Sequence, residues 1–292
     1  MNTKIIPLGG MGEVGKNMYV VMHDDEIIIV DSGVMFPDDD LLGIDYVIQD
    51  YTFLKENESK IKALIITHGH EDHIGSIPFL LQSVTIPKIY APSNAKELID
   101  KKLEERSIVY KDMVIYDEDT VIKTKYFNIE FFRTTHSIPD SHGLSIDTPD
   151  GVIVMTGDFK FDMTPIGPMA NLHKMARIGE KGVSVLMSDS TNAMSPGTSL
   201  SESVVDENLK EIFATYTSNR IILATFASNV YRIKHIIETC KKNNRKIALF
   251  GRSMENMVDI ALKCGYFEDK SIIITAEEAN HLKPGEVCLL CT

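Results

Sequence analysis

The most informative segment of the sequence is Ala63-Leu64-Ile65-Ile66-Thr67-His68-Gly69-His70-Glu71-Asp72-His73. An apolar strand leads into a loop that carries three histidines and an aspartate within six residues, and apolar residues at helical spacing follow over 74–81. Histidine nitrogens and carboxylate oxygens are ligands that zinc takes, and a loop lets closely spaced side chains converge. A solvated polar turn is the alternative, but this density of ligand types favours a metal site.

Further ligand-type residues stand where other expected strands end. They are Asp31 after 27–30, His136 after 131–132, Asp158 after 152–155 and Asp189 after 183–187. Strand ends gathered at one edge of a sheet would bring these side chains to the loop that begins at His68. One such residue carries no weight by itself, and Asp31 alone fits a turn-forming aspartate equally well. The placements taken together indicate a shared site.

The organisation of the chain changes near residue 197. Before it, we expect strands at 4–8, 17–22, 26–30, 63–66, 126–132, 152–155 and 183–187, with helices at 74–81 and 94–106. After it, we expect helices at 203–216, 230–242 and 254–263 between strands at 221–225, 246–250, 272–275 and 287–290. Such alternation is typical of a parallel α/β unit. We therefore predict domains at 1–197 and 198–292, and we interpret the apolar end at 287–292 as that of a truncated or cleaved chain.

Two other patterns have structural interpretations. Gly10-Met11-Gly12-Glu13-Val14-Gly15 matches a dinucleotide-binding fingerprint, but that fingerprint needs a helix after the glycines, and a strand is expected here. A tight turn is the better interpretation. The pair in Cys288-Leu-Leu-Cys291 has the spacing of half a zinc knuckle, yet it lies in a strand-like run with no second pair. We expect buried structural cysteines there.

The composition is that of a globular protein with an acidic balance. The chain has 292 residues, of which 43% are hydrophobic and 25% charged, and a formal net charge of −12. No signal-peptide pattern and no apolar run long enough for a membrane span occurs, so a cytoplasmic protein without membrane contact is expected. The acidic balance argues against attraction to nucleic acid by the overall field. One local exception is the segment 230–252, with seven basic residues and one acidic residue.

This basic segment has two interpretations. It is either a solvated helix face or a track for an RNA backbone. On the second interpretation, the RNA-binding residues are Arg232, Lys241, Lys242 and Arg245.

Several motifs together resemble a known family. The strand followed by H-x-H-x-D-H resembles the signature of the metallo-β-lactamase fold. Gly157-Asp158-Phe159-Lys160 and the segment 134–141 are similar to that fold's bridging-aspartate and third-histidine motifs. Ser188-Asp189-Ser190-Thr191-Asn192 is similar to the first acidic motif of the β-CASP nucleases. With the segments 7–10, 13–17 and 225–229, the resemblance narrows to the ribonuclease J family and covers the whole chain.

The resemblance implies a fold and a set of site residues. The fold would be α/β: a metallo-β-lactamase αββα sandwich, N-terminal part, with the start of an inserted α/β β-CASP domain, both incomplete in this chain. His68, His70 and His136 would hold a first zinc ion, Asp72 and His73 a second, and Asp158 would bridge both. Asp31 would orient the ligand loop and Asp189 would assist proton transfer. With Asp72, these two aspartates are the expected catalytic residues.

The resemblance also implies a function. The protein would be a zinc-dependent ribonuclease of RNA maturation and mRNA decay. It would act both as a 5′-to-3′ exonuclease and as an endonuclease, and would leave 5′-monophosphates. Two Zn²⁺ are expected, with Mn²⁺ or Mg²⁺ as alternatives, and RNA and a second copy in a homodimer or tetramer are the expected partners. Since the family's last zinc-ligand histidine has no match here, the second zinc site would lack one ligand in this fragment, and we expect weak activity or none from the fragment alone.

Two other functions stay open from the residues alone. One is another hydrolase of the same fold, acting on a thioester, lactone or β-lactam, because the zinc loop is common to all of these. The other is a non-catalytic scaffold subunit of an RNA-decay complex, which would be expected to have a damaged metal loop.

Overall fold

The computed structural model describes residues 2–37, 41–267 and 270–292. The chain forms two compact units, which we describe separately. The first contains the chain up to His136 together with Asp140–Lys160 and Ala170–Ser195. The second contains Ser137–Pro139, Phe161–Met169 and Pro196–Thr292. Two short segments that the sequence placed before residue 197 thus pack with the later part of the chain.

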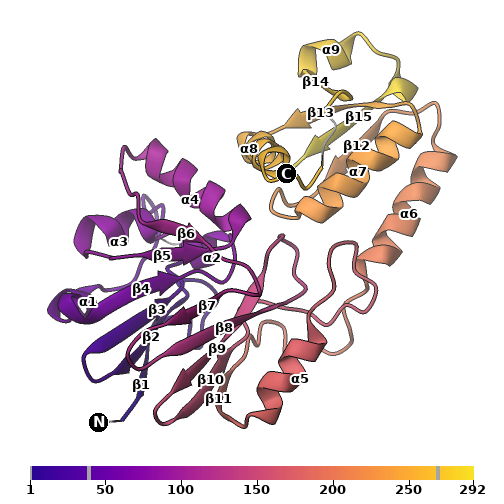
Figure 1. The fold of residues 1–292 in the computed structure, drawn as a ribbon. Helices are drawn as coiled ribbons and strands as arrows, with labels where there is room; N and C mark the ends of the chain where they lie inside the picture. The colour runs from indigo at the N-terminus through magenta and orange to yellow at the C-terminus, as the bar shows by residue number, and fades with distance from the viewer. Residues whose placement is uncertain (1, 38–40, 268–269) are drawn as a thin grey trace. The chain divides into compact units, whose positions relative to one another are not determined.

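A six-stranded sheet begins the first unit (Figure 1). Its strands, in sheet order, are β1 (Lys4–Gly9), β2 (Met18–His23), β3 (Glu26–Val30), β4 (Ile61–Ile65), β5 (Ile89–Ala91) and β6 (Met113–Ile115). The first three strands pair antiparallel, and the pairs from β3 to β6 are parallel. The residues 27–30 of β3 are all buried, because this continuous run of isoleucine and valine faces apolar layers on both sides.

A five-stranded sheet forms the other half of this unit. Its strands, in sheet order, are β11 (Val183–Met187), β10 (Gly151–Met155), β9 (His142–Thr148), β8 (Asn128–Arg133) and β7 (Val121–Lys123). All neighbours are antiparallel except β10 and β11, which pair parallel. One core lies between the two sheets, with Ile28 and Ile65 from the first and Phe131 and Ile146 from the second.

Helices cover the outer faces of both sheets. The helical segments of this unit are α1 (Thr52–Glu56), η1 (Glu58–Lys60), α2 (Glu71–Ile74), α3 (Ile77–Ser83), α4 (Ser93–Glu105) and α5 (Leu172–Glu180). Leu54, Leu80 and Ile99 from α1, α3 and α4 pack on the six-stranded sheet. Ile178 of α5 packs with Phe132 and Val154 of the other sheet. The expected αββα sandwich is therefore confirmed.

The structure differs from the sequence expectation at several elements. The single helix expected at 74–81 is divided into α2 and α3, because Gly75 ends the first and Pro78 lies in the first turn of the second. The strand expected at 126–132 starts two residues later. Strands β5, β6, β7 and β9 and helices α1, α5 and α9 (Ala276–Asn280) were not expected. The glycine-rich stretch around Gly12 forms bends that lead into β2, as expected for a turn.

The second unit is a parallel sheet with helices, as the alternating pattern predicted. Its strands, in sheet order, are β12 (Ile221–Ala224), β15 (Val287–Cys291), β13 (Lys246–Phe250) and β14 (Ile273–Ile274). Its longer helices are α6 (Glu202–Thr215), α7 (Val230–Lys242) and α8 (Arg252–Lys263), and the short η2 (Pro284–Glu286) precedes β15. Cys288 is buried in β15, whereas Cys291 is half-buried. None of the helices in the described ranges has the length and apolarity needed to cross a bilayer.

The position of Arg245 contradicts the prediction that this residue binds RNA. Its side chain is only 2% exposed. The guanidinium donates to backbone carbonyl oxygens, among them Asn219 O at 2.8 Å and Tyr216 O at 2.5 Å. Since these carbonyls follow the end of α6, the arginine ties that end to the start of β13. The expectation that Arg245 contacts RNA is therefore wrong, because its donors are used inside the fold.

Candidate metal centre

The ligand loop leaves the six-stranded sheet at the end of β4. The backbone N–H of Asp31, just past β3, donates to Ile65 O at 2.8 Å, which joins the ends of the two parallel strands. Asp31 has a φ of 61°, a left-handed conformation that aspartate adopts more readily than most residues. Its carboxylate consequently lies beside Thr67, the residue just before the histidines. This contact places the loop next to β3.

Three histidines and one aspartate form the first cluster of donor atoms. His70 Nδ1 lies 3.2 Å from His68 Nε2 and 3.0 Å from His136 Nε2. Asp158 Oδ2 lies 3.9 Å from His68 Nε2 and 3.8 Å from His136 Nε2. In a tetrahedral site with Zn–N bonds of about 2.0–2.1 Å, ligand nitrogens are about 3.3 Å apart. The imidazole spacing is close to that value.

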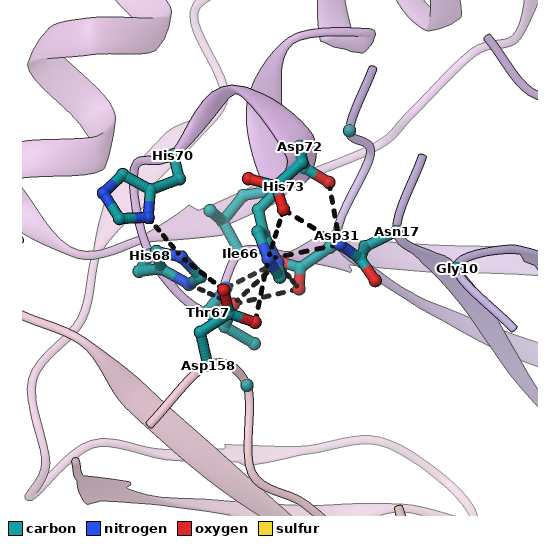
Figure 2. A network of polar contacts seen from close by, with 12 residues as sticks. Gly10, Asn17, Asp31, Ile66, Thr67, His68, His70, Asp72, His73 and Asp158 are labelled. Carbon is teal, nitrogen blue, oxygen red and sulfur yellow. Dashed lines mark hydrogen bonds and ion pairs between the residues drawn. The ribbon is translucent and has the colours of Figure 1, made fainter. Parts of the chain in front are cut away.

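A second cluster shares Asp158 with the first. His73 Nε2 lies 3.2 Å from Asp158 Oδ1 and 3.5 Å from Asp72 Oδ2. The atoms of each cluster lie within 4.8 Å of one another. One oxygen of Asp158 faces each group, so a single carboxylate belongs to both clusters (Figure 2). Of the ligand-type residues expected at strand ends, His68, His136 and Asp158 therefore lie together in these clusters.

The hydrogen bonding of the first cluster fits a cation better than it fits a proton network. A single proton on His70 Nδ1 can serve His68 or His136, but not both. The other nitrogen, His70 Nε2, is buried and has no hydrogen-bond partner among the described residues. Neutral imidazoles that point lone pairs at one place are the form in which histidine binds metal. The residues present therefore fit a divalent cation.

Asp31 and Thr67 fix two of the imidazole rings. Asp31 Oδ2 lies 2.8 Å from His73 Nδ1 and accepts the Thr67 hydroxyl at 2.9 Å. Asp31 Oδ1 accepts the Thr67 backbone N–H at 2.8 Å. The Thr67 hydroxyl oxygen also lies 3.0 Å from His68 Nδ1. With both Nδ1 atoms used in this way, the Nε2 atoms of His68 and His73 are left for ligation.

Burial and neighbouring charge shift the pKa values of these groups. Burial lowers the pKa of His70 and of His136 to about 4, and it holds the pKa of His68 well below its ordinary value. For His73, burial opposes protonation but Asp31 and Asp158 outweigh it, so the pKa is raised well above the ordinary value. Burial also opposes ionisation of Asp158, yet the surrounding histidines lower its pKa to about 2.

The other expected site residues lie outside these clusters. Asp189, past β11, accepts the Thr191 backbone N–H at 2.8 Å, and its own N–H donates to Thr156 Oγ1 at 3.0 Å. Lys241 and Lys242 are exposed at the end of α7, whereas Arg232 pairs with Glu202 at 2.7 Å. None of these expectations is tested by the geometry.

Sequence reasoning missed two residues that contact the ligands, Asn17 and Thr67. The amide nitrogen of Asn17 lies 3.2 Å from His73 Nε2, although 56 residues separate the two in sequence. Thr67 lies within the segment 63–73, but a threonine between a strand and a histidine does not by itself indicate a contact with metal ligands. Asn17, in contrast, reaches the site only through the fold.

Two family models match the chain. The model of the metallo-beta-lactamase superfamily matches residues 11–181. The model described as "Ribonuclease J, beta-CASP domain" matches residues 218–292. The first match covers most of the unit that holds both clusters, and the second covers all four strands of the parallel sheet.

The similar proteins agree with these matches. The chain is 48% identical to "Ribonuclease J 1" of Streptococcus pyogenes serotype M3 and 46% identical to "Ribonuclease J" of Mycoplasma pneumoniae, in each case over 99% of the chain and 51% of the relative. It is 44% identical to "Ribonuclease J" of Synechocystis, over 99% of the chain and 46% of the relative. The chain spans about half the length of these curated relatives.

A solved structure shares the fold. A protein of unknown function from Enterococcus faecalis V583 superposes with a TM-score of 0.74 at 17% identity, over 99% of this chain and 77% of that one. At this identity the likeness concerns the fold alone.

Proposed function

This chain belongs to the metallo-beta-lactamase superfamily and to its ribonuclease J group, and we propose that it binds two zinc ions and hydrolyses phosphodiester bonds in RNA. The observation that carries the proposal is the pair of donor clusters that share Asp158, in a chain similar to ribonucleases J over 99% of its length. Mn²⁺ or Mg²⁺ in place of zinc is an alternative.

In the proposed site each residue has one role. His68, His70 and His136 hold one ion, Asp72 and His73 hold the other, and Asp158 contacts both. Two such ions make water a nucleophile at neutral pH and neutralise charge on phosphoryl oxygens. At the first ion, the protein's part is to keep neutral imidazoles and an ionised carboxylate in place, which the lowered pKa values of His70 and Asp158 favour.

Two further aspartates complete the proposed machinery. Asp31 holds the rings of His68 and His73 through the contacts described above, so it acts on the ions through their ligands. Asp189 is half-buried after β11, and we assign it assistance in proton transfer. Asp72, which we place as a ligand, is also required for turnover.

The proposal for the whole protein rests on the family. In this proposal the whole protein is a cytoplasmic enzyme of RNA maturation and mRNA decay. It is both a 5′-to-3′ exonuclease and an endonuclease that leaves 5′-monophosphates, and it works as a homodimer or tetramer. Residues 1–197 supply the metal domain and 198–292 belong to the β-CASP domain. Arg232, Lys241 and Lys242 remain candidates for contact with the RNA backbone, now without Arg245.

Hydrolysis of a labelled oligoribonucleotide tests the proposal. The whole protein, of which this chain is a part, is loaded with metal and incubated with the RNA and, in parallel, with thioester, lactone and β-lactam substrates. We expect RNA products with 5′-monophosphate ends, and no products from Asp72→Ala, because that substitution removes a proposed ligand. Turnover of one of the other substrates instead would indicate a different hydrolase of this fold. Metal binding without any turnover would favour the scaffold alternative.

A further inference from the structure

The glycine-rich stretch that resembled a nucleotide fingerprint lies beside the second donor cluster. Tyr19 links the two: its hydroxyl lies 3.2 Å from Gly10 O and 3.1 Å from Asn17 Oδ1, so it can donate to either. Figure 2 shows Asn17 next to Asp72 and His73, on the side of the site where the backbone of Gly10 passes. The segment therefore touches the site through a side chain that the proposed function does not use.

Asn17 contacts the ligands of the second cluster at several points. Its amide nitrogen donates to Asp72 O at 3.2 Å, and its backbone N–H donates to the same carbonyl at 3.1 Å. The amide nitrogen also lies 3.5 Å from Asp72 Oδ2 and 3.2 Å from His73 Nε2. One side chain thus holds the backbone between the two ligands and faces both of their donor atoms.

Gly10 is required for this arrangement. A Cβ at Gly10 would lie 2.5 Å from Asn17 Oδ1 and 2.6 Å from the Tyr19 hydroxyl, closer than real contacts allow. Gly12, in the same stretch, has a similar left-handed φ, +74° against +83° for Gly10, yet a Cβ there would meet no atom of the described residues within 4 Å. The two glycines therefore have the same backbone requirement, but only Gly10 must be free of a side chain to leave room for Asn17 and Tyr19.

We propose that Asn17 is a positioning residue for the second metal ion, held in place by Tyr19 and by the close approach of Gly10. The inference rests on the proposed function, because it assigns Asn17 to ligands of that site. The first ion depends on His68, His70 and His136, none of which Asn17 contacts in the hydrogen bonds above. The two ions should consequently respond differently to a change at Asn17.

Titration of the metal-free chain with Zn²⁺ or Co²⁺ tests the inference, with the two binding steps measured separately. We expect Asn17→Leu, which is close in size but has no amide, to weaken the second step by about 10–100-fold and leave the first unchanged. Gly10→Ala should act in the same direction. Tyr19→Phe removes one hydroxyl and should give a smaller effect without risk to the fold. Gly12→Ala, with the same left-handed strain, is the control and should keep both steps.

The outcomes separate the inference from the function it rests on. Equal losses in Gly10→Ala and Gly12→Ala, or losses in both binding steps, would overturn the role of Asn17 and indicate general damage to the fold. A lower melting temperature with unchanged metal affinity would likewise leave only a structural role. If the unsubstituted chain binds no second ion, the two-ion proposal itself fails.

Discussion

Asp31→Asn is the substitution whose effect the structure specifies most fully. The Asp31 carboxylate accepts hydrogen bonds from the Thr67 N–H at 2.8 Å and the Thr67 hydroxyl at 2.9 Å, and it lies 2.8 Å from His73 Nδ1. Asparagine has nearly the same shape and also tolerates a left-handed φ, so the backbone should keep its conformation. One oxygen, however, becomes an NH₂ group that donates.

The expected loss of zinc affinity follows from the contact of Asp31 with His73. When an amide nitrogen faces Nδ1, the ring can bond to it only with its proton on Nε2, the atom we assign to the second ion. A change in such a supporting partner costs about 10–100-fold in metal affinity, which is about 1.4–2.7 kcal/mol. In the metal-free chain, loss of the buried ion pair should lower the free energy of unfolding by about 3 kcal/mol.

The assay is a zinc titration with a chelator of known affinity, together with urea unfolding of the metal-free chain. Asp24→Asn is the matched control, because Asp24 also has a left-handed φ, of 52°, and accepts a hydrogen bond, from the Tyr126 hydroxyl at 2.9 Å. Unchanged zinc affinity in Asp31→Asn would show that Asp31 does not support zinc binding through His73. So would an equal loss in the control.

Three further predictions concern stability and RNA. Arg245→Leu should lower the free energy of unfolding by about 3–5 kcal/mol, since several buried carbonyls lose their donor, whereas Lys242→Ala should stay within about 0.5 kcal/mol in urea unfolding. The metal-free chain should lose stability as the pH falls from about 6.5 toward 4, because unfolding lets His70 and His136 bind protons that their lowered folded pKa values exclude. Unfolding curves against pH should therefore flatten in a His70→Asn, His136→Asn double variant; an unchanged slope would contradict this. If α7 contacts RNA, neutralising Lys241 and Lys242 should reduce the slope of log affinity against log salt by about 1.4, and an unchanged slope leaves them as solvated residues.

The ligand loop and most of the longer elements could be predicted from the sequence. The histidines and carboxylates of 68–73 are dense enough to stand out, and the apolar run before them identifies a strand. The alternation of helices and strands beyond residue 197 likewise predicted the parallel sheet. These features depend on local patterns of side-chain type, which a single sequence contains.

Strand β9 shows why other elements were missed. Gly143 and the buried Ser145 interrupt its apolar pattern, so no strand stands out in the sequence. The glycine is needed because a Cβ there would lie 2.3 Å from the Phe132 ring on the neighbouring strand. A residue required by such a close approach looks, in the sequence alone, like a break in the strand.

Arg245 and Asn17 show the same limit for single side chains. An arginine in a basic segment is assigned to the surface by composition, yet here backbone carbonyls take its donors in the interior. An asparagine after a glycine-rich turn carries no metal signal, and its contact with His73 exists only because β2 lies beside β3 and the ligand loop. Both depend on segments that are distant in the chain.

The proposed function depends on two donor clusters that hold cations through a shared Asp158. Zinc per chain, measured by atomic spectroscopy after dialysis against a zinc buffer, tests it most directly. We expect two zinc ions in the unsubstituted chain and a loss of zinc in Asp158→Ala, with the fold retained by circular dichroism. An unsubstituted chain that holds no zinc, or an Asp158→Ala chain that keeps both ions, would contradict it.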